Sequence, residues 1–333
     1  MKSIVVKNDY GLENVIIVEK EIPQIQANEV LVKVNAISLN QLDLMIAKGA
    51  FGTQLPHQLG SDAVGVVEKI GKDVSFLKVG DTVATHFIQD WHSGRLKDIY
   101  LKSSLGTANE GVFAEYISLS EKSLVKIPQN LTAEEASTLP IAGLTAWEAL
   151  VNIGNLKAGE TVLLKGTGGV SIFALQFAKT IGANVIITSS SDDKLEKVKE
   201  LGADFTVNYK TDGDWAKKVL DLTSGNGVDL ALETSWSDIE TTIQTMKLGG
   251  KIVAIGLLGG HETNLSFFSV VQKSITISGI QVGSKSSFEE MNRAIEINKL
   301  IPVIDKTFTL SNLTEAFTYF NEGNHVGKIV IKL

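Results

Sequence analysis

The sequence predicts an α/β protein with two domains, one mostly β and one built on a doubly wound parallel sheet of six strands. The 333 residues are enough for two hydrophobic cores. Short β-type runs separated by glycines and polar turns fill residues 1–127. From about residue 132, apolar strands alternate with helical stretches. We therefore expect the mostly-β domain in residues 1–127, completed by residues 280–333, and the doubly wound domain in residues 128–279.

Each expected element follows from a local run of residues. The first domain should contain short strands at residues 4–6, 15–18, 29–37, 63–70, 82–85, 113–117 and 124–126. The six strands of the second domain should lie at residues 161–165, 184–188, 205–207, 228–232, 251–255 and 274–278. Two helices, at 288–299 and 313–322, precede a last strand at 328–332. We expect that strand to return to the first domain and to leave a ligand cleft between the domains.

Composition and charge exclude several classes of protein. A hydrophobic content of 44% and a charged content of 21% are typical of a soluble globular protein. The net charge of −7 argues against nucleic acid or an anionic membrane as the main partner. The chain has no long apolar run and no signal-peptide pattern, and its lack of cysteine excludes thiolate chemistry. We expect a cytoplasmic enzyme that binds neither nucleic acid nor membranes.

The most specific local pattern lies at residues 161–194, where a strand, a glycine-rich turn, an amphipathic helix and a second strand follow one another. Glycines in such a turn let the backbone approach a pyrophosphate, and the N-terminus of the helix favours the anion. Ser171 stands at the third small position, where glycine is usual. The pattern predicts a dinucleotide site made by Gly166, Thr167, Gly168, Gly169 and Val170.

The end of the second strand of this unit indicates which dinucleotide binds. An NAD site usually carries Asp or Glu there, to bind the adenine ribose. This chain has Ser189, Ser190 and Ser191 instead, followed by Lys194. Hydroxyls and an ammonium suit a 2′-phosphate, so we expect NADP(H) as the cofactor. The alternative is that Ser191 or Asp192 only caps the next helix while Lys194 is solvated.

Several further segments occur in a specific order along the chain. They are 36–43 (AISLNQLD), 60–67 (GSDAVGVV), Gly80-Asp81, 111–116 (GVFAEY), 139–147 (LPIAGLTAW), Asn208-Tyr209 and 327–330 (GKIV). With the glycine turn, they resemble the medium-chain dehydrogenase/reductase superfamily, in particular its zinc-independent quinone oxidoreductase-like and zinc-type alcohol dehydrogenase-like branch. The resemblance covers nearly the whole chain. It implies a GroES-like catalytic domain with an inserted Rossmann NADP-binding domain.

The resemblance also permits a test for zinc. In zinc-dependent alcohol dehydrogenases of this superfamily, a cysteine, a histidine and a second cysteine hold the catalytic metal, with an acid beside them. The corresponding positions here are Asn40, Ser61 and Ile141, with Asp62 as the nearby acid. Amide, hydroxyl and isobutyl groups are not the ligands that zinc prefers, and the cysteines of the structural zinc lobe are missing. We expect no zinc, the alternative being a substitute site at His86, Asp90 and His92.

Other site residues are implied by the resemblance. Asn40, Asp43 and Thr145 are expected at the nicotinamide end as the catalytic residues. Asn40 and Asp43 could instead form a turn and a helix cap, and Thr145 could simply be packed in the helix that starts near residue 142. Further cofactor contacts are expected from Tyr209, Gly256, Leu257 and Lys328. For Tyr209 and Lys328, an ordinary aromatic at a strand end and a solvated lysine at a strand edge are the alternatives.

The substrate pocket is expected to contain aromatic side chains that stack on a flat ring. The candidates are Phe87 and Trp91 from one loop, and Phe267 and Phe268 from the second domain; ordinary core packing is the alternative for each. His92 could donate a proton to a developing enolate, or it could be a solvated loop residue. The sequence therefore identifies no general acid, and water could serve.

The leading hypothesis is an NADPH-dependent reductase of quinones or α,β-unsaturated carbonyl compounds. Without a metal, the acceptor must be intrinsically electrophilic or be activated by hydrogen bonds. The alternatives are a zinc-free alcohol or aldehyde dehydrogenase-like enzyme and a catalytically silent NADPH-binding regulatory protein. The resemblance further implies a homodimer joined along the sheet edge near residues 274–278.

Overall fold

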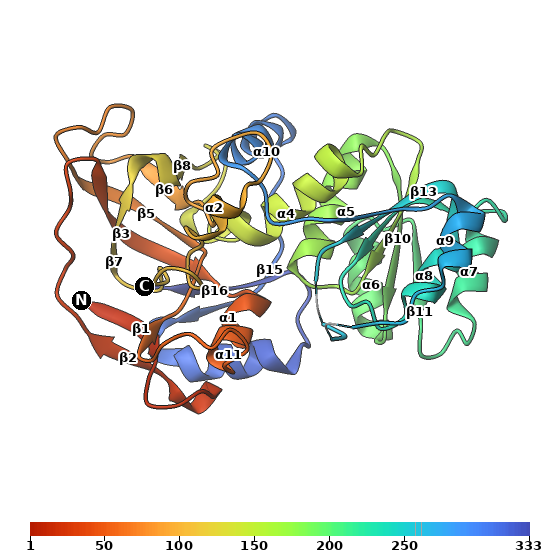
Figure 1. Ribbon diagram of the computed structural model, residues 1–333, viewed down its shortest axis with the longest axis horizontal. Helices are drawn as coiled ribbons and strands as arrows, with labels where there is room; N and C mark the ends of the chain where they lie inside the picture. The colour runs from red at the N-terminus through yellow and green to blue at the C-terminus, as the bar shows by residue number, and fades with distance from the viewer. Residues whose placement is uncertain (257, 261) are drawn as a thin grey trace. The chain divides into compact units, whose positions relative to one another are not determined.

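The structure is a computed structural model that describes residues 1–256, 258–260 and 262–333 (Figure 1). Its chain forms two compact units, Met1–Leu144 together with Val282–Leu333, and Thr145–Gln281. We expected the first boundary at residue 127, but the first unit continues to Leu144. The helix α3 (Ala133–Ala136) packs on strands of this unit and therefore belongs to it. The return to the first unit at Val282 lies close to the expected residue 280.

A seven-stranded sheet forms the framework of the first unit. Its strand order is β15-β16-β3-β5-β6-β8, and β7 pairs with β3. The strands are β3 (Glu29–Ser38), β5 (Ala63–Ile70), β6 (Thr82–Thr85), β7 (Tyr116–Ser120), β8 (Leu124–Lys126), β15 (Ile304–Thr309) and β16 (Lys328–Lys332). The last strand, β16, does return to the first unit, where it runs antiparallel to β3 with Val330 opposite Ser38. Figure 1 shows this blue strand beside the red and orange strands of the N-terminal region.

A smaller sheet and several helices complete the first unit. The sheet has the order β2-β1-β4, with β1 (Lys2–Val6), β2 (Val15–Glu19) and β4 (His57–Gln58). The α-helices are α1 (Gln41–Ala47), α2 (Asp98–Leu101), α3, α10 (Lys285–Asn298) and α11 (Leu313–Glu322). Short 3-10 turns lie at Leu12–Asn14, Glu121–Ser123 and Leu310–Asn312, and η3 (Leu139–Gly143) is π-helical.

The second unit contains the predicted doubly wound parallel sheet of six strands, which is confirmed. The order is β11-β10-β9-β12-β13-β14, and every pairing is parallel. The strands are β9 (Thr161–Lys165), β10 (Asn184–Ser189), β11 (Phe205–Asn208), β12 (Val228–Glu233), β13 (Met246–Ala254) and β14 (Thr276–Gly279). The order reverses between β9 and β12, and ligands of such sheets bind at the carboxyl ends of the strands beside this reversal.

Helices and a row of buried side chains complete the second unit. The helices are α4 (Leu144–Trp147, which spans the boundary between the units), the π-helical η4 (Glu148–Ile153), α5 (Gly169–Ile181), α6 (Asp192–Glu200), α7 (Trp215–Leu222), α8 (Ile239–Thr245) and α9 (Phe267–Lys273).

A row of buried side chains crosses the middle of the sheet. It consists of four fully buried residues that lie opposite one another on neighbouring strands, Ile186 on β10, Leu163 on β9, Ala231 on β12 and Ile252 on β13. This row explains why the strands read as apolar runs. In the described part of the chain, no helix is both long enough and apolar enough to cross a bilayer.

Candidate functional site

The glycine turn connects β9 to α5, as the sequence predicts. Gly166 has a φ of +77°, a left-handed conformation that favours glycine. A Cβ atom at Gly166 or Gly168 would meet no atom within 4 Å, so the protein leaves space above the turn. Gly168 is the N-cap of the 13-residue helix α5 and provides no side-chain cap. The N-terminal N–H groups of α5 are therefore suited to bind an anion such as a pyrophosphate.

Ser171 fits the third small position of the turn through a hydrogen bond. Its side chain is buried, and its hydroxyl donates to the carbonyl oxygen of Lys165 at 2.8 Å. The hydroxyl of Thr234, which follows β12, donates to the same oxygen at 3.3 Å. The last residue of β9 is thus bonded to both the helix and the neighbouring strand end.

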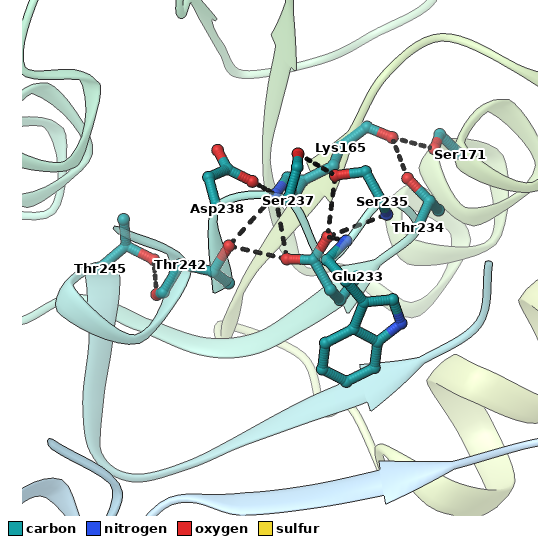
Figure 2. Close-up of polar contacts among 10 residues, drawn as sticks. Lys165, Ser171, Glu233, Thr234, Ser235, Ser237, Asp238, Thr242 and Thr245 are labelled. Atoms are coloured by element: carbon teal, nitrogen blue, oxygen red, sulfur yellow. Dashed lines mark hydrogen bonds and ion pairs between the residues drawn. The ribbon is translucent and has the colours of Figure 1, made fainter. Parts of the chain in front are cut away.

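An ion cluster surrounds Lys165, the residue directly before the turn (Figure 2). The Lys165 ammonium donates to Glu233 at 3.0 Å and to the Thr242 hydroxyl at 3.3 Å, and it also pairs with Asp238. Glu233 is fully buried and accepts further bonds from the Thr242 hydroxyl and the Ser235 N–H. Burial alone would raise the pKa of Glu233, but the Lys165 charge and these hydrogen bonds outweigh it and lower that pKa below its usual value.

The cluster connects the ends of β9 and β12, the two strands between which the sheet order reverses. Lys165 and Glu233 are the last residues of these strands. Our sequence reasoning missed both, because a charged residue at the end of an apolar strand is typical of a solvated strand end. The available signal was that both parallel strands end in charges of opposite sign, which meet at one edge of the sheet.

The residues predicted for the adenosine end lie together around the end of β10. Ser189 is buried, and its hydroxyl accepts from the Ser191 N–H at 3.3 Å. The Tyr209 N–H donates to the Ser189 carbonyl at 3.1 Å, which places Tyr209 next to that strand end. Ser191 also caps α6 by accepting from the N–H of Lys194, so the capping role proposed as an alternative is present. The cap uses the backbone N–H of Lys194 and not its ammonium, so capping and a phosphate contact are compatible.

The loop after β13 approaches the loop after β12. A Cβ atom at Gly256 would lie 2.6 Å from the Thr234 carbonyl oxygen, so only glycine permits this approach. Leu257, the other cofactor residue predicted in this loop, lies outside the described residues.

A second polar cluster is buried in the first unit, where β3, α1 and β16 meet. The Lys328 ammonium donates to the Leu39 carbonyl at 2.7 Å and to Asn40 Oδ1 at 2.6 Å, and it lies 3.9 Å from Asp62 Oδ2. Asp43 accepts from the Asn40 N–H at 2.7 Å, so it caps α1. Lys328 is 3% exposed, and the predicted alternative of a solvated lysine at a strand edge is therefore wrong.

Burial strongly perturbs the acids of this cluster. It raises the pKa of Asp43 to about 8, assisted by the charge of Asp62 and opposed by the Asn40 N–H and by Lys328. It raises the pKa of Asp62 to about 6, opposed mainly by the charge of Lys328. Burial also lowers the pKa of Lys328, although Asp62 and Asp43 oppose that shift. At neutral pH Asp43 is therefore protonated, while Lys328 and Asp62 each favour the charged form of the other.

The predicted pocket residues fall into two groups, one in each unit. Phe87 and Trp91 are each 7% exposed, and the Trp91 indole donates to the Gly94 carbonyl at 2.8 Å, while His92 is exposed. In the second unit, Phe267 and Phe268 begin α9 and are 82% and 72% exposed.

The remaining predicted residues are a catalytic threonine and an alternative metal site. Thr145, the predicted catalytic threonine, is a buried residue of α4. Within the described ranges, His86, Asp90 and His92 form no metal-binding group. His86 is fully buried, and burial lowers its pKa to about 4.

Comparison with known proteins identifies the family of this chain. The family model of the alcohol dehydrogenase GroES-like domain matches residues 26–129, and that of the zinc-binding dehydrogenases matches residues 169–296. A zinc-type alcohol dehydrogenase-like protein of Schizosaccharomyces pombe is 41% identical, over 95% of this chain and 94% of its own length. The chain belongs to the medium-chain dehydrogenase/reductase superfamily. It is therefore an oxidoreductase of that superfamily.

Two solved structures of the superfamily share the fold over the whole chain. One is an NAD-dependent alcohol dehydrogenase that is 34% identical, with a TM-score of 0.91, and the match covers 100% of both chains. The other is a quinone oxidoreductase of Pseudomonas syringae that is 27% identical, with a TM-score of 0.85, and the match covers 100% of this chain and 99% of that one.

The residues at the superfamily's zinc-ligand positions do not fit zinc. Asn40 offers an amide, Ser61 a hydroxyl and Ile141 only its backbone. All three contact a buried ion pair instead. Asn40 accepts from Lys328, while the Ser61 hydroxyl (3.3 Å) and the Ile141 N–H (3.5 Å) donate to Asp62. In this chain these three residues therefore bond to Lys328 and Asp62 and provide no ligand set for zinc.

We predict that Lys165→Met destabilises the protein by about 3–5 kcal/mol, because it leaves the Glu233 carboxylate buried without its cation. Chemical denaturation measures the change. Lys179→Met is the matched control; it breaks a half-exposed pair with Asp204 and should cost less than about 1 kcal/mol. Equal losses in the two variants would contradict the prediction, and Glu233→Gln added to Lys165→Met should recover part of the loss.

We also predict that Asp43→Asn changes how stability depends on pH. Folded Asp43 keeps its proton to about pH 8, whereas an unfolded aspartate releases it near pH 3.8. Ionisation therefore opposes folding, and wild-type stability should fall as the pH rises between these two values. The amide does not titrate, so the melting temperature of the variant relative to wild type should increase from pH 5 to pH 8.5. Asp73→Asn, at an exposed position, controls for the change of net charge; a pH-independent difference for Asp43→Asn would contradict the prediction.

Proposed function

We propose that the protein is an NADPH-dependent oxidoreductase that transfers a hydride to a quinone or an α,β-unsaturated carbonyl compound without zinc. The observation that carries the proposal is the contact of Lys328 with Asp62, because it involves the residues that the resemblance aligns with the zinc ligands and the nearby acid. A simple alcohol loses a hydride readily only after a metal or a general base has helped to deprotonate it. An ammonium that is already bonded to two protein oxygens offers no such assistance.

Quinones and enones do not need that assistance. When bound, NADPH supplies the hydride from C4 of its dihydronicotinamide. The reduced acceptor spreads its negative charge over a conjugated system and then takes a proton from water. The chain must position the acceptor and donate hydrogen bonds to its oxygen, and we assign this role in the first unit to Asn40 and Asp43.

The choice of NADPH rests on the residues at the end of β10. Ser189 and Ser190 provide hydroxyls, and Lys194 lies on the first turn of α6. Tyr209 is half-exposed and lies next to Ser189, where its ring can cover the adenosine phosphate. No carboxylate follows β10 before Asp192, which accepts a bond from the Asn208 amide at 2.6 Å. This arrangement favours a 2′-phosphate over a free ribose hydroxyl.

A zinc-free alcohol or aldehyde oxidoreductase is the second candidate. The names of the relatives favour it, since one is called alcohol dehydrogenase-like and one solved structure is an NAD-dependent alcohol dehydrogenase. Steady-state oxidation of NADPH, with a panel of quinones, enones and aldehydes, tests both candidates. Turnover with quinones or enones supports the proposal. Turnover only with aldehydes, or with alcohols and NADP⁺, would support the second candidate.

We predict that Lys194→Ala weakens NADPH binding by about 10- to 100-fold and leaves NADH binding unchanged, because one charge-assisted hydrogen bond to the 2′-phosphate is lost. Fluorescence titration with both nucleotides measures the change. Lys197→Ala, an exposed lysine of the same helix, is the matched control and should change neither affinity. An equal loss for NADH and NADPH in Lys194→Ala would rule out the phosphate contact.

We further propose that two copies of the chain form a dimer through the α9 and β14 side of the second unit. Phe267, Phe268 and Val271 of α9 are each more than 70% exposed, and β14 is an edge strand. Light scattering should give a molar mass of twice 35.8 kDa. Replacing Phe267 and Phe268 by Asp should give monomers, whereas Ile297→Asp, at an equally exposed position of the first unit, should not. A monomeric wild type would contradict the proposal.

A further inference from the structure

The hydrogen bonds of Lys328 fix the orientation of the Asn40 side chain. The Lys328 ammonium donates to two acceptors of the β3–α1 junction, the Leu39 carbonyl and the Asn40 side-chain oxygen. Because an ammonium can only donate, the 2.6 Å bond fixes which end of the Asn40 amide faces Lys328. The NH2 end must point the other way.

The opposite end of the amide is more weakly held. Asn40 Nδ2 lies 3.5 Å from the Ser38 carbonyl, at the limit of a hydrogen bond, and the side chain also hydrogen-bonds to Asp62, which lowers the pKa of that acid. The bond to Ser38 is the one that a ligand oxygen can replace at least cost. Asn40 is also the most exposed member of the cluster, at 6% against 3% for Lys328 and 0% for Asp62.

We infer that Lys328 is a positioning residue: paired with Asp62, it holds the Asn40 carboxamide by its oxygen, so that the amide offers only hydrogen-bond donors to the carbonyl oxygen of the acceptor. This inference rests on the proposed function, and it deepens it by selecting the substrate class. An amide that offers only donors suits a carbonyl or quinone oxygen, which accepts hydrogen bonds and gains negative charge as the hydride arrives. It suits less well an alcohol, whose hydroxyl proton needs an acceptor.

The charges of the cluster agree with this role. Asp62 balances the Lys328 ammonium at 3.9 Å, so the cation does not have to be neutralised by the substrate. Asp43 accepts from the Asn40 backbone N–H and fixes the main chain of the same residue. Lys328 and Asp43 thus restrain the side chain and the backbone of Asn40, respectively. Neither residue exchanges a proton with the acceptor in this scheme.

A double-mutant cycle on the full-length protein tests the inference. The variants are Lys328→Met, Asn40→Ala and the combination of both, measured with a quinone and NADPH. We expect each single variant to lower kcat by about 10- to 100-fold, while the Kd of NADPH stays within about twofold. The double variant should lose no more than about threefold beyond the worse single variant, because Lys328 acts through Asn40. Lys328→Arg should recover part of kcat.

Two controls separate positioning from a general structural role. Lys332→Met changes an exposed lysine of the same strand and should leave kcat unchanged. If Lys328→Met does not fold because Asp62 is left unpaired, Lys328→Met combined with Asp62→Asn removes both charges and should still show the loss of kcat.

The possible outcomes are distinct. A Lys328→Met enzyme with kcat within about threefold of wild type, or losses that multiply in the double variant, would overturn the inference. A wild type that reduces no quinone or enone but oxidises alcohols would overturn the proposed function and the substrate class inferred from the donors of Asn40. The same cycle, measured with the alcohol, would then still test separately whether Lys328 acts through Asn40. If Lys332→Met lowered both kcat and the melting temperature, any substitution in β16 would be expected to disturb the enzyme. This result would also count against a specific role for Lys328.

Discussion

The buried ammonium of Lys328 is the interaction on which the polar corner of the first unit depends. It joins the last strand of the chain to the β3–α1 junction, through bonds to Leu39 and Asn40. Asp62 compensates the charge of Lys328 and accepts hydrogen bonds from the Ser61 hydroxyl and the Ile141 N–H. The ion pair thus connects the β3–α1 junction, the segment before β5 and the last strand. Removing either partner would destabilise the fold, because the other charge would then be buried without compensation.

The second unit also contains a buried ion pair, which lies next to the glycine turn. Lys165 ends β9 and is neutralised by Glu233, which ends β12. The ion pair and its hydrogen bonds hold the two strand ends together where the sheet order reverses, directly before the left-handed Gly166. A rigid turn is useful there, because the N-terminus of α5 can bind a pyrophosphate well only if its N–H groups are already in place.

Much of this organisation could be predicted from the sequence, and the exceptions have physical reasons. Apolar runs and glycine positions were sufficient for the parallel sheet and the turn, because these depend on local patterns. The pairing of Lys328 with Asp62 could not be predicted, since the two residues lie far apart in the sequence and only the antiparallel pairing of β16 with β3 brings them together. Lys165 and Glu233 were missed because a charged residue at a strand end does not reveal that its partner is buried. The compact first unit continues to Leu144, beyond the expected boundary at residue 127, since the packing of α3 against this unit depends on tertiary contacts.

Hydride transfer without a bound metal is the central claim, and metal analysis of the active enzyme tests it most directly. The zinc content of the purified protein should be measured together with its quinone reductase rate, before and after dialysis against a strong chelator. The account predicts far less than one zinc ion per chain and a rate that dialysis does not change. About one tightly held zinc per chain, with activity that is lost on its removal and restored by its return, would contradict it.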